Sequence, residues 1–183
     1  MDFESQRFPV GSFRCPIEIT GEHIARWIGV LDGFPKRLEA EVRPLRTEQL
    51  GWTYRSGGWT IRQVVHHLAD SHMNSLVRFK LALTEDKPTI RPYQEDRFAL
   101  LPDARSNDLS GSLDILRGVH QRWVHMLREL DPRDFSRSFH HPESDREITL
   151  DENTGLYAWH CDHHLQHIRH AVALGGPKTQ GSR

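Results

Sequence analysis

The sequence predicts an all-α protein: a four-helix bundle with a long connection between its second and third helices and a possible small hairpin before the fourth. Three observations support this class. Four long segments repeat apolar residues at helical spacing. Capping signals open several of them, and stop signals such as Asp131-Pro132 and Gly175-Gly176 close others. At 183 residues the chain suits a single domain spanning 1–183.

The first helix follows residues 1–19, which we expect to form an extended arm. Thr20 is a suitable N-cap. Pro35 interrupts the helical pattern and predicts a kink or a break, because proline has no backbone N–H. The apolar stripe of this helix consists of Ile24, Trp27, Ile28, Leu31, Leu38, Val42 and Leu45.

The second helix is expected from Thr60 to about Thr84. Thr60 and Gln63 have the spacing of a capping box, in which the two side chains satisfy backbone N–H groups at the helix start. Residues 85–109 then contain three prolines and predict a long irregular connection. Connections of this length inside a compact domain are usually functional.

The third helix is predicted by a stripe that runs from Leu113 to Leu130. A hairpin with its turn within Pro142–Asp145 can follow it. Thr149 and Glu152 suggest a second capping box at the start of the fourth helix. Residues 177–183 are expected to be a disordered tail.

Composition excludes several classes of function. A formal net charge of −1 provides no field that would attract nucleic acid or an anionic membrane. No apolar run approaches the length of about 20 residues that spans a bilayer. Two cysteines, Cys15 and Cys161, are too few for a disulfide framework and favour a reducing compartment. We therefore expect a soluble, cytoplasmic protein that binds neither nucleic acid nor membrane.

Thirteen histidines are the unusual feature of the composition. His160 and His164 are four residues apart, so both rings lie on one face of the fourth helix. His67 lies on the apolar stripe of the second helix and can supply a third ligand. Three protein ligands and one open position are typical of a catalytic zinc site, whereas structural sites usually close all four positions. One divalent metal is therefore expected, with zinc favoured and nickel or cobalt possible.

Other interpretations of these histidines stay open. A histidine on an apolar face is more often a hydrogen-bonded core residue than a ligand. His163 and His167 are also four residues apart and form a rival pair, and His167 can instead be a further ligand or contact a ligand. We expect His163 to point towards the flank of its helix and to meet solvent or a neighbouring helix. The remaining histidines are interpreted as polar bundle positions (His72, His120, His125), as a helix-edge residue (His66) or as exposed hairpin residues (His140, His141).

No catalytic side chain stands out. Asp70 is a candidate to accept the second ring N–H of His67, because ligating histidines usually donate that group to a neighbour. A solvated aspartate is an equally good interpretation. Glu152 is better explained by capping than by catalysis.

Two stretches resemble a known family: YRSGGWTIRQVVHHLADSHMNSLVRFKLALTE and LYAWHCDHHLQHI. Together with shorter matches they resemble the YfiT branch of the DinB-like superfamily over most of residues 8–172. The resemblance implies a four-helix bundle with one divalent metal between helices. It places the three family ligands on His67, His160 and His164, with no departure at those positions.

The resemblance also implies an activity. It suggests a homodimeric, metal-dependent hydrolase that attacks a small-molecule substrate with a metal-activated water. Related enzymes imply a second possibility, a transferase that uses a low-molecular-weight thiol such as bacillithiol, mycothiol or glutathione. A third possibility is a non-catalytic metal-binding stress protein.

Overall fold

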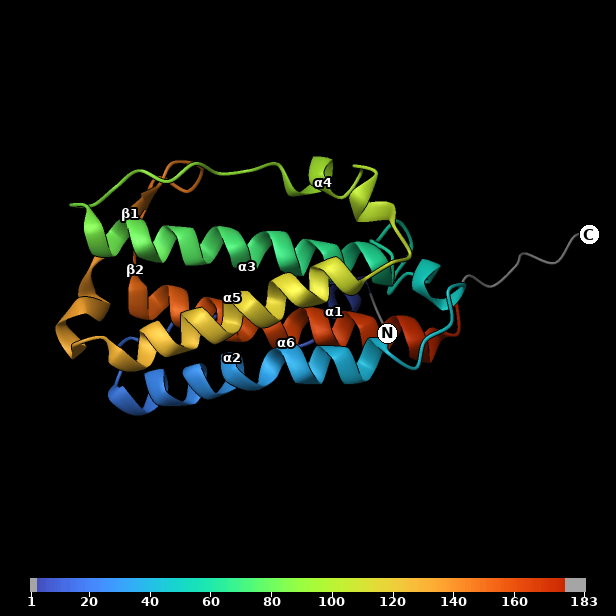
Figure 1. The fold of residues 1–183 in the computed structure, drawn as a ribbon, viewed down its shortest axis with the longest axis horizontal. Helices are drawn as coiled ribbons and strands as arrows, with labels where there is room; N and C mark the ends of the chain where they lie inside the picture. Colours follow the sequence, from blue (N-terminus) through green and yellow to red (C-terminus); the bar gives the residue numbers. More distant parts are fainter. Residues whose placement is uncertain (1–2, 177–183) are drawn as a thin grey trace, which may run out of the picture.

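Four long helices form the bundle that the sequence predicts (Figure 1). A computed structural model of the chain describes residues 3–176. The helices are α2 (Gly21–Val42), α3 (Ile61–Thr84), α5 (Ser110–Glu129) and α6 (Leu150–Leu174). Among the described residues no helix has the length and apolar character needed to cross a membrane.

The bundle topology follows from the long connection. Residues 85–109 run back along α3 to the end where α3 began, so α5 starts there and runs parallel to α3 (Figure 1). The connection contains two short helical segments, α4 (Glu95–Phe98) and a 3-10 helix (Asp103–Arg105). Helix α2 packs mainly against α6, and α3 packs against α5. As a result α3 and α6 are antiparallel (Figure 1). His67 of α3 meets His160 near the middle of α6.

One apolar core lies between the four helices. It contains most of the predicted α2 stripe, although Ile24 and Leu45 are only partly buried, and Phe34, which the predicted stripe omitted, is fully buried. Phe139 from the hairpin also belongs to this core. Burial of large apolar side chains is the main favourable contribution to folding. The largest fully buried side chains include Trp123, Phe34, Phe79, Phe139, Leu31 and Leu38.

The starts of α2 and α3 are confirmed. The Thr20 hydroxyl accepts a hydrogen bond from the backbone N–H of His23. At α3 the predicted capping box is present. The backbone N–H of Gln63 donates to the Thr60 hydroxyl, and the side-chain Oε1 of Gln63 accepts the backbone N–H of Thr60 at 3.0 Å. The caps satisfy backbone donors that a helix start would otherwise leave unpaired.

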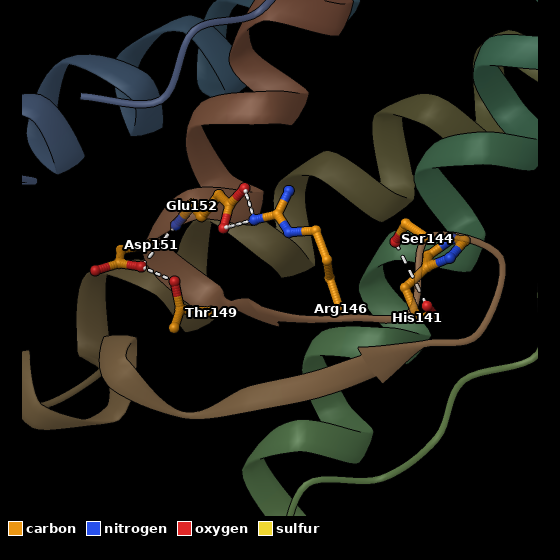
Figure 2. A network of polar contacts seen from close by, with 6 residues as sticks. All are labelled: His141, Ser144, Arg146, Thr149, Asp151 and Glu152. Carbon is orange, nitrogen blue, oxygen red and sulfur yellow. Dashed lines mark hydrogen bonds and ion pairs between the residues drawn. The ribbon is translucent and has the colours of Figure 1, made fainter. Parts of the chain in front are cut away.

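The capping box predicted for α6 is wrong (Figure 2). The Thr149 hydroxyl donates to the carboxylate of Asp151 instead of accepting from the helix. That carboxylate also accepts the backbone N–H of Glu152 at 2.6 Å. The Glu152 side chain turns away and accepts two hydrogen bonds from Arg146, at 2.9 and 3.1 Å. An arginine brought close by the hairpin therefore outcompetes the local backbone partner.

The predicted hairpin is confirmed. Strands β1 (Ser138–His141) and β2 (Arg146–Thr149) pair antiparallel around a turn at residues 142–145. The connection joins this hairpin, because the Ile90 N–H donates to the His140 carbonyl at 3.0 Å. His140 and His141 are half-buried, so their predicted full exposure is wrong.

Two further expectations need correction. Residues Phe3–Arg7 form a short helix, α1, so the N-terminal arm is not extended throughout. Pro35 does not break α2, which continues to Val42 as one helix. The predicted disordered tail, 177–183, lies outside the described residues. The glycine stop is present: Gly175 ends α6 with a φ of 72°, a left-handed conformation that glycine adopts without a steric penalty.

Candidate metal centre

A cleft of about 390 Å³ opens beside α6, between the N-terminal segment, the loop before α3, and α4. It is lined by the three predicted ligands, His67, His160 and His164. Carboxylates of Glu95 and Asp96 lie along the same cleft. Its aromatic lining consists of Phe8, Tyr54, Trp59 and Trp159.

The structure brings the three predicted ligands together. His160 and His164 lie one turn apart on α6, and His67 faces them from α3. One ligand nitrogen from each ring lies within 4.8 Å of the others. The Nε2 atoms of His67 and His160 are 3.3 Å apart. Two nitrogens that bind one tetrahedral zinc at 2.0–2.1 Å are about 3.3–3.4 Å apart, so this separation fits a shared metal.

Burial keeps these imidazoles neutral. It lowers the pKa of His67 to about 3, with the nearby His163 as a second cause. Burial also lowers the pKa values of His160 and His164 well below the ordinary value, with neighbouring imidazoles adding to the effect. A neutral imidazole has one free lone pair, which is the form that binds a metal.

His167 fixes the orientation of His164. Its Nδ1 lies 3.3 Å from Nδ1 of His164, and its Nε2 lies 3.2 Å from the carbonyl oxygen of Arg7. Because a carbonyl only accepts, His167 donates from Nε2, and its Nδ1 accepts from His164. Nε2 of His164 then carries the free lone pair that can bind a metal. Tyr54 stacks on the His167 ring at a centroid distance of 3.8 Å.

His163 is 7% exposed, which excludes solvent, one of the two environments predicted for it. Its ring stacks on Trp159 with centroids 4.4 Å apart, and Phe8 of the N-terminal segment lies 6.0 Å away. The N-terminal segment covers this side of α6, which explains the burial. The three rings of His163, His164 and His167 also offer ligand atoms within 4.8 Å of one another, so the rival pair is close to the cleft.

Asp70 is not placed as its candidate role requires. No hydrogen bond joins its carboxylate to His67 among residues 3–176, although its backbone carbonyl accepts from Asn74. His66 is buried against α5, where Nδ1 contacts the Ser112 hydroxyl at 2.8 Å. The expectation that His66 lies at the helix edge is therefore wrong.

Sequence reasoning missed the roles of His72 and His120. Both are buried, and His72 contacts the far side of the ligand His160 through a hydrogen bond of 3.1 Å. The position of His120 within an apolar stripe was the available signal. Of the cleft residues outside α3 and α6, those at 54–59 lie in the first family-like stretch, whereas Arg7, Phe8, Glu95 and Asp96 lie in no motif and reach the cleft only through the fold.

The fold and the site together define a class of protein: a four-helix bundle that gathers histidines from two antiparallel helices at one cleft. The family model described as the DinB superfamily matches residues 31–168. The chain therefore belongs to the DinB superfamily.

Curated relatives share most of its length. The chain is 48% identical over 161 residues to a Bacillus subtilis (strain 168) protein named "Putative metal-dependent hydrolase YfiT", covering 88% of this chain and 90% of the relative. It is 47% identical over 164 residues to an Oceanobacillus iheyensis protein with a metal-dependent hydrolase name of the same form, covering 90% and 94%.

Two solved structures share the fold. The structure of Bacillus subtilis YfiT, described as "a probable metal-dependent hydrolase with an unusual four-helix bundle topology", superposes with a TM-score of 0.90. It is 45% identical, and the match covers 94% of this chain and 99% of that one. A mycothiol-dependent maleylpyruvate isomerase matches with a TM-score of 0.59 at 16% identity, covering 90% and 67%, and shares the fold alone.

Proposed function

We propose that this protein is a metal-dependent hydrolase that acts on a small-molecule substrate. The observation that carries the proposal is the convergence of His67, His160 and His164 at the cleft. Relatives that match almost the whole chain carry hydrolase names, which supports the same class.

The three imidazoles suit zinc first and nickel second. All three are nitrogen donors, and imidazole is a good ligand for both metals. The separation of 3.3 Å between two Nε2 atoms fits tetrahedral zinc. No carboxylate or thiolate belongs to this group of three, so the metal keeps its full positive charge. When bound, such a metal polarises a substrate oxygen and lowers the pKa of water to about 7.

The protein residues of the cleft bind the substrate and limit access of water. A cleft of about 390 Å³ fits a small molecule and lies within the range of roughly 300–1,000 Å³ that ligand pockets occupy. Its aromatic walls favour an apolar or aromatic group on the substrate. Trp59 lies against the His67 ring with centroids 4.7 Å apart and holds that ring towards α6.

Metal content and activity test the proposal together. The protein is stripped with a chelator, reloaded with zinc or nickel, and assayed against a panel of small esters, amides and phosphoesters. We expect one equivalent of metal and hydrolysis that depends on it. His160→Ala and His164→Ala should each lose the bound metal, whereas the control His125→Ala, at an exposed site on α5, should keep it.

Three results would contradict the proposal. A His164→Ala protein that retains a full equivalent of metal would overturn the ligand assignment. A metal-loaded protein that hydrolyses nothing in the panel, and that unfolds when the metal is removed, would favour the non-catalytic interpretation. Turnover that requires an added thiol such as bacillithiol or glutathione would instead identify a thiol transferase.

A further inference from the structure

Three imidazoles form a continuous chain that starts at the half-buried His160 and continues through the buried His72 and His120. Nδ1 of His160 lies 3.1 Å from Nε2 of His72. Nδ1 of His72 lies 2.7 Å from Nε2 of His120. Nδ1 of His120 lies 2.7 Å from the backbone carbonyl oxygen of Leu31 in α2. The chain thus crosses the core from the cleft to the opposite helix.

Pro35 explains why this carbonyl is available. In an α-helix the carbonyl of residue 31 accepts the N–H of residue 35. Proline has no N–H, so the carbonyl of Leu31 loses its usual partner inside a continuous helix. His120 supplies the replacement donor. A buried carbonyl left without a partner is costly, so this hydrogen bond has a structural reason to persist.

The carbonyl sets the direction of every hydrogen bond in the chain. It can only accept, so His120 donates from Nδ1 and its Nε2 becomes an acceptor. His72 must then donate from Nδ1 and accept at Nε2. His160 must therefore carry its proton on Nδ1. Its free lone pair is on Nε2, the atom that lies 3.3 Å from Nε2 of His67.

We propose that His72 and His120 are positioning residues that hold His160 in the tautomer and orientation required for metal binding, with Pro35 providing the anchoring carbonyl. The link to metal binding rests on the proposed function. The tautomer of His160 follows from the hydrogen bonds alone and does not depend on that function. In other metal sites, removing the partner that orients a ligating histidine weakens metal binding by about 10–100-fold.

Packing around the chain supports this role. The Phe34 ring stacks on His72 with an interplanar angle of 20° and lies 5.4 Å from His120. Tyr157 meets the His72 ring edge-on at 81°. His72 is 0% exposed and His120 is 2% exposed. This packing holds the two rings in place, and the acceptor-only carbonyl of Leu31 sets the order of donors and acceptors.

The tautomers can be measured directly in the metal-free protein. Two-bond ¹H–¹⁵N correlation spectra of histidine-labelled protein distinguish an Nδ1–H ring from an Nε2–H ring. We expect His160, His72 and His120 all to be Nδ1–H. A spectrum with His160 in the Nε2–H form would overturn the proposal, whatever the activity of the enzyme.

Three variants test the effect on metal binding. His72→Met removes both hydrogen bonds and should weaken metal binding by about 10–100-fold. His72→Gln should recover most of that affinity, because its amide can accept from His160 and donate to His120. The matched control is His66→Met, which removes another buried histidine of α3 whose hydrogen bonds go to Ser112 and Ser106. It should leave metal affinity unchanged.

Each outcome has a defined meaning. A folded His72→Met protein that binds metal as tightly as the wild type, with His160 still Nδ1–H, would overturn the proposal. If that variant does not fold, the wild-type tautomers and the affinity of His72→Gln decide. If the tautomers are as expected but the wild type binds no metal, the proposed function fails and the positioning of His160 stands.

Discussion

Acidification should destabilise the metal-free protein, because folding buries several histidines in neutral form. Burial is the main cause that lowers the pKa of His67 to about 3 and that of His120 to about 4. It likewise lowers the pKa of His163 to about 4 and that of His167 to about 3. In the unfolded chain each of these histidines has a pKa of about 6.5 and takes up a proton below it.

The sign follows from proton linkage. A histidine whose pKa is depressed by folding contributes its full stability above about pH 6.5 and loses it as the pH falls towards the folded value. At about pH 5.5, one unit below the unfolded pKa, each such group lowers the free energy of unfolding by about 1.4 kcal/mol relative to pH 7.5. His67 and His120 together cost about 3 kcal/mol. His163 and His167 line or border the cleft, and solvent screening reduces their share, so the four together cost about 4 kcal/mol.

That loss is large against the roughly 5–15 kcal/mol that usually stabilises a domain. Urea unfolding of the metal-free protein, followed by circular dichroism at about pH 7.5, 6.5 and 5.5, measures it. We expect little change down to pH 6.5 and a steep fall below it. His67→Gln should reduce the acid loss by about 1.4 kcal/mol. A free energy of unfolding that is constant within about 1 kcal/mol over this range would refute the reasoning.

Two further predictions concern packing and assembly. A Cβ added at Gly155 would lie 2.9 Å from the Trp27 ring, so Gly155→Ala should destabilise the fold by about 1–3 kcal/mol, reduced by the gain in helix propensity. The control Gly118→Ala has open space around the added Cβ and should stabilise the fold by about 0.5–1 kcal/mol. Thermal unfolding measures both changes. The homodimer implied by family resemblance stays a prediction: light scattering should give a mass of twice 21.3 kDa, and a mass of one chain would contradict it.

Much of the fold could be predicted from the sequence because its signals are local. The apolar repeat of a helix and the capping box at Thr60 depend only on residues within a few positions of one another. The same is true of the four-residue spacing that puts His160 and His164 on one face of α6. His67 could be chosen because its phase on the apolar stripe points into the core.

Local signals failed where a residue outside the recognised pattern bonds to the same group. Glu152 has capping-box spacing, yet Arg146 binds its carboxylate once the hairpin folds. Pro35 predicted a kink or a break; the break is absent, and a histidine from α5 satisfies the carbonyl that proline leaves unpaired. Neither the capping-box spacing nor the proline itself indicates these partners.

Sequence by itself determined four helices, their approximate limits and three candidate ligands, since each depends on contacts within a few turns of one helix. The tertiary structure alone decided the path of residues 85–109, the cleft, and the partners of each imidazole. His72 and His160 are 88 residues apart. Their contact exists because the returning connection makes α3 antiparallel to α6, and chain direction in a bundle is set by the packing of whole helices.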